Sequence, residues 1–224
     1  MNDDEWHKWF QGVWEDREEN LYRKFFGELD DHCYKLKEDI FADNYGMDNY
    51  EPSWLTNVVI ESPPSAIRNN WLYVTSGLSN PIGCEPDKIK EGDFSGMGFE
   101  MIIETQEQVE WPIDILHNII AYQILVATSH VEGNILDYSS IMPFENGVAD
   151  NSTIDHMVII EPTSPSNYPS TFSLSSGAVD FFLLFGMTSK EVSVLSGNEE
   201  VDLIERFQGK TSFPITEINR DSVV

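Results

Sequence analysis

The pattern that most constrains the fold is one long apolar helix set between short apolar runs of strand type. Trp111-Pro112 opens the helix, because proline fits a first helical turn. The apolar residues that then recur on one face are Ile113, Leu116, Ile120, Ile124 and Ala127. The strand-type runs are 55–60, 71–76, 99–104, 157–160, 171–175 and 179–185. Strands without regular strand-helix alternation predict an α+β fold, a mixed, largely antiparallel β-sheet covered by helices, not a doubly wound sheet.

Shorter helices are predicted at both ends of the chain. Apolar residues recur at three- and four-residue spacing over Asp3–Glu19 and again over Leu21–Leu36. We expect two further helices at 189–195 and 199–207, and a loop over 43–52, where Asp, Asn, Gly and Pro cluster. No Gly/Ser-rich or Pro-rich linker divides the chain. The sequence therefore predicts an N-terminal helical segment, residues 1–50, packed on one domain, residues 51–224.

The charge of the chain is strongly negative and unevenly distributed. The 224 residues include 39 acidic and 13 basic side chains, a net charge of −26, while 41% hydrophobic residues argue against disorder. From Glu91 to Ser189 there is no Lys or Arg across 99 residues, but there are 14 Asp or Glu residues. Such a surface disfavours nucleic acids and anionic membranes and favours a protein partner with a basic surface. Solubility alone, or a salty habitat, is the alternative explanation.

The sequence also bears on the compartment. The N-terminus has no basic region followed by an apolar stretch, so no secretory signal is predicted, and polar residues interrupt the longest apolar run, 113–127. Cys33 and Cys84 stand outside any Cys-x-x-Cys motif, which is typical of ordinary thiols in a reducing compartment. We expect a cytoplasmic protein. The sequence does not decide whether the two cysteines form a disulfide.

Signals for catalysis are few. The chain contains no Gly-x-Ser-x-Gly elbow, no His-Glu-x-x-His motif and no Walker-type loop, and its five histidines do not form a zinc spacing. The glycine-rich segment 95–98 precedes a strand, so we interpret it as a tight turn or a close backbone approach. His117 is interpreted as a packing histidine. We therefore expect no enzyme, no metal and no cofactor, with catalysis by carboxylates and His156 as a minor alternative.

The long acidic loop 130–155 is the predicted partner-binding surface, because a loop of this length usually has a function. Asp155 and His156, at its end, are expected to form a hydrogen bond that orients the loop. The candidate contact residues are Glu132, Asp137, Tyr138, Glu145, Asp150, Asp155 and His156. The sequence does not define an oligomeric state.

Several ordered motifs resemble the suppressor-of-fused domain family. Trp71-Leu-Tyr-Val-Thr-Ser-Gly-Leu-Ser79 is similar to the family's Trp-His-Tyr-Val/Ile-Ser-Phe-Gly-Leu-Ser, and Ser95-Gly-Met-Gly-Phe-Glu100 to its Ser-Gly-x-Gly-x-Glu. Trp111-Pro112, His156-Met157, 185–191 and 215–218 follow in the family's order, the last as its closing strand. The resemblance covers about 58–224. Leu72 and Ser76 depart from the pattern.

The resemblance implies a fold like the N-terminal domain of that family and a role in protein binding. Animal members hold a transcription-factor peptide between this domain and a second one. We do not expect this mode of binding for the present chain. The resemblance to single-domain bacterial members implies an immunity protein that neutralises a cognate toxin, and an acidic surface suits a basic, nuclease-type toxin. The alternative is an intracellular adaptor that binds a partner peptide as an added strand at a sheet edge.

Overall fold

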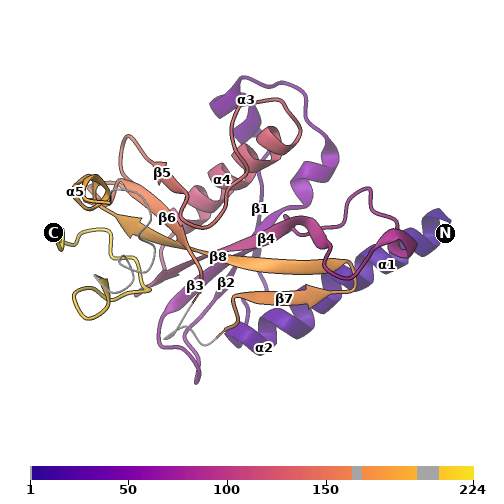
Figure 1. Cartoon of the computed structure of the whole chain (residues 1–224), viewed down its shortest axis with the longest axis horizontal. Helices are drawn as coiled ribbons and strands as arrows, with labels where there is room; N and C mark the ends of the chain where they lie inside the picture. The colour runs from indigo at the N-terminus through magenta and orange to yellow at the C-terminus, as the bar shows by residue number, and fades with distance from the viewer. Residues whose placement is uncertain (1, 163–167, 196–206) are drawn as a thin grey trace.

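The protein is organised around one eight-stranded mixed sheet (Figure 1). The computed structural model describes residues 2–162, 168–195 and 207–224. The strands are β1 (Cys33–Lys35), β2 (Val58–Ser62), β3 (Trp71–Ser76), β4 (Phe94–Thr105), β5 (Ile141–Pro143), β6 (His156–Ile160), β7 (Thr171–Leu174) and β8 (Gly177–Met187). Their order across the sheet is β1-β2-β3-β4-β8-β6-β5, and β7 pairs with β8. The predicted α+β class with a largely antiparallel sheet is confirmed.

The two longest strands form the centre of the sheet. β4 and β8 pair in parallel, and the other pairings are antiparallel. The register of β4 against β8 shifts between Phe94 and Phe99, so the glycine-rich segment lies in an irregular part of the ladder. Because the order runs from β1 to β5, these two short strands are the edges of the sheet.

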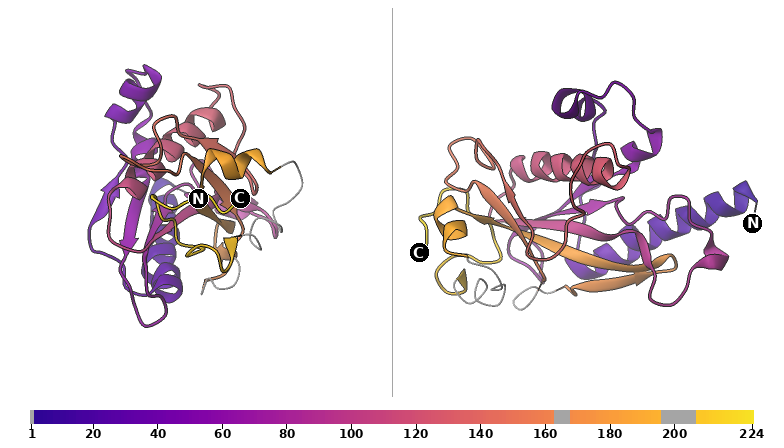
Figure 2. Two further views of the ribbon diagram at one scale, coloured as in Figure 1. Left: turned by 90° about the vertical axis from the view of Figure 1, so that its left-hand side faces the viewer. Right: turned by 45° about the horizontal axis from the view of Figure 1, so that its top comes forward.

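Helices cover both faces of the sheet (Figures 1 and 2). Helix α4 (Trp111–Ala127) lies on one face, and the N-terminal helix lies on the other. Alternate residues of β4 serve the two cores: Met101 and Ile103 pack with α4, while Ile102 packs in the core that contains Tyr22 and Phe26. The apolar strands are thus buried on both faces. The predicted helix that opens at Trp111-Pro112 and includes Ala127 is confirmed.

The N-terminal prediction was wrong in part. The first helix is continuous from Asp3 to Phe26 through α1 (Asp3–Glu15), a π-helical turn η1 (Asp16–Tyr22) and α2 (Arg23–Phe26). It ends at Gly27, which has a φ of 90°, a backbone angle that residues with a side chain rarely adopt. The helix predicted over Leu21–Leu36 therefore stops early. Residues 33–35 form β1 instead, because Cys33 pairs with Ile60 of β2.

Other elements differ from expectation in their bounds. Helix α3 (Asp39–Tyr45) extends into the predicted loop, and β5 lies inside the long acidic loop. Short 3-10 turns occupy η2 (Pro52–Thr56) and η3 (Pro86–Lys88), so the first predicted strand begins only at Val58. Helix α5 (Ser189–Ser193) is present, whereas residues 199–206 of the next predicted helix, 199–207, lie outside the described residues.

The expected closing strand was wrong. Residues 215–218 form an irregular segment rather than a strand, and the Thr216 amide donates to the Glu104 carbonyl oxygen at 2.9 Å. Hydrogen bonds from the Gly186 amide to the Thr216 hydroxyl and from the Thr153 amide to the Ile218 carbonyl also anchor this segment without continuing the sheet. In the described parts of the chain, no helix combines the length and apolarity needed to cross a membrane.

Candidate functional site

The carboxylate at the end of the glycine-rich motif organises the loop after β3. Glu100 is fully buried, and its Oε1 accepts hydrogen bonds from the amides of Gly77 and Ser79, at 3.0 and 2.9 Å. The Ser79 hydroxyl donates to the same oxygen at 2.6 Å, and the Thr75 hydroxyl donates to Oε2. The two sequence motifs 71–79 and 95–100 therefore meet through one buried carboxylate, which fixes the turn between them.

The same network holds the N-terminal helix. Arg17 is 0% exposed, and its guanidinium donates to Ser76 Oγ at 3.0 Å, Ser79 Oγ at 2.9 Å and Asn80 Oδ1 at 2.9 Å. It lies 3.9 Å from Glu100 Oε1, so the buried charges compensate each other. Burial raises the pKa of the neighbouring Glu18, which accepts a hydrogen bond from Ser76.

A glycine makes this close approach possible. Gly96 has a φ of 57°, and a Cβ at this position would lie 2.6 Å from the carbonyl oxygens of Leu78 and Asn80. Only glycine fits there without displacing backbone. The interpretation of segment 95–98 as a close backbone approach is confirmed.

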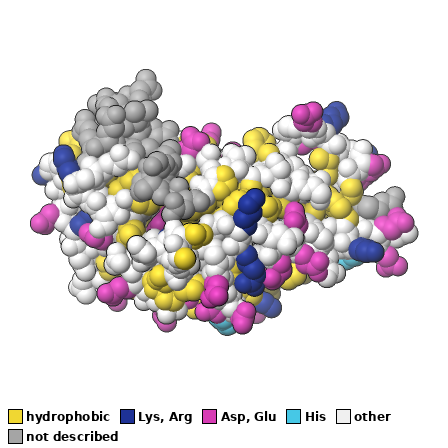
Figure 3. Space-filling model, turned by 90° about the horizontal axis from the view of Figure 1, so that it is seen from below, with side chains coloured by type: hydrophobic (Ala, Val, Ile, Leu, Met, Phe, Trp, Pro, Cys, Tyr) yellow, Lys and Arg dark blue, Asp and Glu magenta, His cyan; other side chains and the backbone are white. Residues whose placement is uncertain are grey.

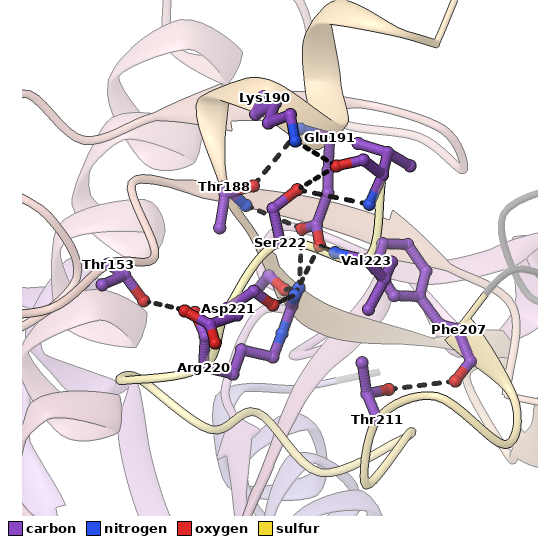
Figure 4. Close-up of polar contacts among 12 residues, drawn as sticks. Thr153, Thr188, Lys190, Glu191, Phe207, Thr211, Arg220, Asp221, Ser222 and Val223 are labelled. Atoms are coloured by element: carbon purple, nitrogen blue, oxygen red, sulfur yellow. Dashed lines mark hydrogen bonds and ion pairs between the residues drawn. The ribbon is translucent and has the colours of Figure 1, made fainter.

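A second buried carboxylate, in the motif after β8, holds the C-terminal residues (Figure 4). Arg220 donates to both oxygens of Glu191 and, at 2.8 Å, to the Gly186 carbonyl, while the Val223 amide donates to Glu191 at 3.0 Å. Burial acts to raise the pKa of Glu191, but the hydrogen bonds from Arg220 and the Thr188 and Val223 amides outweigh it and lower that pKa. This motif is therefore an anchor for the chain end.

A third buried carboxylate follows the same rule. Glu104 is 3% exposed and accepts hydrogen bonds from the Tyr168 hydroxyl at 2.7 Å and from the Asn70 amide. Burial raises its pKa, although both hydrogen bonds act to lower it. Each of these carboxylates has its oxygens occupied by donors of the chain itself. Within the described ranges, no group of three His, Cys, Asp or Glu residues could hold a metal ion.

The predicted contact residues take two kinds of position. Asp155 and His156 do meet, with Oδ1 and Nδ1 2.8 Å apart, and the Ser189 hydroxyl also donates to Asp155. Burial acts to raise the pKa of Asp155, but the hydrogen bonds from Ser189 and His156 hold it below its usual value. Tyr138 turns inward, with its ring centroid 4.9 Å from that of Phe182. These three residues help to hold the loop against the sheet.

The remaining predicted residues, Glu132, Asp137, Glu145 and Asp150, are exposed. The first three adjoin the segments 133–136 and 140–144 that line a groove of about 530 Å³ beside the edge strand β5. Asp150 lies in a turn farther along the loop. Three of the predicted acids therefore neighbour groove-lining residues in sequence.

The lining of the groove combines apolar side chains with polar ones such as Asn118, Asn134 and Ser140. Ile135 and Ile141 are 45% and 37% exposed there, which places two large apolar side chains in contact with solvent. None of its lining residues is Lys or Arg. By contrast, the molecule seen from below, on the side of the N-terminal helix, carries Lys and Arg among its acidic side chains (Figure 3).

Sequence reasoning missed the wall of the groove that comes from helices. Asn118, Ile119 and Tyr122 of α4 and Tyr45 of α3 line it. Asn118 and Tyr122 are four residues apart, so they share one face of the helix. These two residues interrupt the apolar pattern of the helix on that face. That polar and aromatic face was the available signal. His117 is buried as expected, with Nε2 3.0 Å from the Tyr34 carbonyl oxygen, and burial lowers its pKa.

Comparisons with known proteins agree with this architecture. A suppressor of fused homologue from Neisseria gonorrhoeae superposes with a TM-score of 0.63 at 16% identity, covering 97% of this chain and 98% of that one. Drosophila Suppressor of Fused matches with a TM-score of 0.56 at 17% identity, covering 83% of this chain and 50% of that chain. A chain of a Sufu–Fu complex matches with a TM-score of 0.55 at 18% identity, covering 83% and 89%.

The sequence itself carries the family assignment. No curated protein matches the chain in a sequence comparison. The family model described as Suppressor of fused protein (SUFU) matches residues 52–221, a span that contains the buried carboxylates Glu100, Glu104 and Glu191. The chain therefore belongs to the suppressor of fused protein family.

Proposed function

We propose that this chain is a non-catalytic protein-binding domain that docks a basic segment of its partner in the groove beside β5. The observation that carries the proposal is the coincidence of three features at one edge of the sheet. An open edge strand, two exposed isoleucines and three exposed acids, Glu132, Asp137 and Glu145, all belong to the segments around this groove.

Electrostatics supports a basic partner over a neutral one. Apart from Tyr45, the residues that line the groove belong to the span 91–189, which contains no Lys or Arg to offset its acids. A partner with Lys or Arg around an apolar contact would bury Ile135 and Ile141 and approach faster because of the negative field. The solved Sufu–Fu complex supports protein binding as the type of function.

The direct test is affinity capture from extracts of the source organism with three proteins. One is the wild type, and the second reverses the groove acids through Glu132→Lys, Asp137→Lys and Glu145→Lys. The third is a control of equal net charge that reverses the exposed Glu28, Glu51 and Glu107, which lie outside the groove lining. We expect the wild type and the control to capture the same partner at low salt and the groove variant to lose it. Equal capture by all three proteins would refute the proposal.

Strand addition along β5 is the second candidate for the mode of binding. Met142 pairs with Met157 while the Phe144 amide donates to Asp155, so the alternation of the ladder turns the backbone of Ile141 toward the open edge. Pro143 has no amide to donate, which limits an added strand to a few hydrogen bonds. Ile141→Pro would remove the donor at the edge. If binding survives high salt but not this substitution, strand addition replaces charged docking.

The specific role that we propose is neutralisation of a cognate toxin in the cytoplasm. A dense acidic surface could occupy the basic nucleic-acid site of a nuclease-type toxin, and the charge of the groove supports this reading. Co-expression with the toxic domain encoded next to the gene should rescue growth. If the neighbouring product is not toxic, or if toxicity persists, the domain is an adaptor for a different basic partner.

A further inference from the structure

At the opposite edge of the sheet, no strand of the described residues pairs with the outer side of β1. The Leu36 amide donates to the Asn57 carbonyl at 3.0 Å, and Tyr34 lies opposite Val59. Because hydrogen bonding alternates along an antiparallel ladder, the N–H and C=O groups of Cys33 and Lys35 point away from β2. β1 is the first strand in the sheet order, and Lys35 is exposed. Two donors and two acceptors therefore face outward at this edge.

We infer that β1 pairs with β1 of a second copy of this chain, across a two-fold axis at Tyr34. In this antiparallel register Cys33 lies opposite the partner copy's Lys35, and Lys35 opposite its Cys33. Both pairs then exchange their outward donors and acceptors, which satisfies all four groups of each chain. A register shifted by two residues would leave one pair of groups on each strand unmatched.

The flanking charges favour this register. Asp31 and Lys37 are exposed and lie three residues on either side of Tyr34, so the two-fold axis places Asp31 of each copy across from Lys37 of the other. The segment 31–37 thus carries opposite charges at its two ends and is complementary to itself. By contrast, residues 130–155, which contain β5, include acids but no Lys or Arg. Beside β1, a groove of about 650 Å³ is lined by Tyr34, Ile113 and His117, which leaves room for side chains of the second copy.

Net charge sets the conditions for this dimer. Each copy carries −26, so long-range repulsion opposes association, and a short strand pairing alone buries little surface. We expect a weak, concentration-dependent dimer that becomes stronger when salt screens the repulsion, at about 0.3 M. The surface is distinct from the groove beside β5, so the outcome does not depend on the proposed function.

Disulfide trapping tests the register with a native cysteine. In the proposed register a cysteine at position 35 faces Cys33 of the other copy, and the Cα atoms of such a pair are about 5.5 Å apart, within the reach of a disulfide. Lys35→Cys in a Cys84→Ser background should form a covalent dimer on mild oxidation. The matched control, with Cys33→Ser added, should remain monomeric on a non-reducing gel. Equal yields of covalent dimer in the two proteins, or none in either, would overturn the inference.

Charge exchange provides an independent test without cysteine chemistry. Lys37→Glu places like charges at both ends of the paired strands and should raise the dimer dissociation constant by about tenfold in analytical ultracentrifugation. Adding Asp31→Lys restores opposite charges at both ends of the paired strands and returns the net charge to that of the wild type. It should therefore restore association. A double variant that dimerises no better than Lys37→Glu, or a wild type that stays monomeric at about 100 µM, would contradict the pairing.

Discussion

Replacement of Glu100 by glutamine isolates the charge of the buried network with almost no change of shape. Glu100 accepts hydrogen bonds from Gly77, Ser79 and Thr75 and lies opposite Arg17, and both charged side chains are 0% exposed. A glutamine amide at this position offers one oxygen as an acceptor and turns its N–H₂ group toward the donors that the second carboxylate oxygen accepts in the wild type. Arg17 would also lose one of the two carboxylates within 4 Å, and the one that remains is Glu18, 3.8 Å away.

The expected cost follows from burial. Removing one partner of a buried ion pair destabilises a protein by about 3–5 kcal/mol, because the remaining charge stays desolvated. That is a large part of a typical free energy of unfolding of about 5–15 kcal/mol. Removing both charges, in Arg17→Met/Glu100→Gln, should cost less than the sum of the two single changes.

Urea unfolding followed by tryptophan fluorescence measures these free energies. The control is Glu107→Gln, at an exposed position, which should change the free energy of unfolding by less than about 0.5 kcal/mol. A Glu100→Gln protein within about 1 kcal/mol of the wild type would refute the reasoning. Strict additivity of the Arg17 and Glu100 changes would show that the two charges do not interact.

Three further predictions concern other buried groups. Arg220→Met should destabilise the protein by about 3–5 kcal/mol and speed hydrogen exchange at the Val223 amide, because Glu191 loses its partner; unchanged exchange would contradict the anchor. The pKa of Glu104 is raised in the fold, so the stability it contributes is present below its ordinary pKa of 4.5 and is lost as pH rises through the folded value. Glu104→Gln should therefore gain stability relative to wild type as pH rises from about 4 to about 7 in urea unfolding, and a constant difference would be the contrary result. The imidazole of His117, titrated by NMR, should have its midpoint below 6.5, so its stabilising contribution is present above that pH and is lost on acidification; a midpoint above 6.5 would show an exposed or ion-paired ring.

Much of the fold was predictable because the decisive patterns are local. Helix 111–127 combines proline in the first turn with an apolar face, and 71–76 is a run of apolar and β-branched residues. The N-terminal error has a physical cause. Leu29 and Cys33 continue a helical spacing, but Gly27 ends the helix, and the partner of Cys33 is Ile60, which local sequence cannot reveal.

The site was predictable only in part. Charge counting located the acidic loop, but exposure decides which of its residues can meet a partner, and Tyr138 turned inward onto Phe182. Glu100 and Glu191 stand in the motifs that resemble the family, and each is paired with a buried arginine that lies far away in sequence. Such pairings depend on the tertiary fold, so no spacing rule anticipates them.

The most direct measurement of the central claim is an NMR titration of isotope-labelled protein with the captured partner. We expect the amide shifts to concentrate at 132–145 and at Tyr45 and Tyr122, which line or adjoin the groove beside β5. The groove variant with Glu132, Asp137 and Glu145 reversed should lose these shifts. Shifts confined to the N-terminal helix or to the C-terminal residues held by Glu191 would contradict the account.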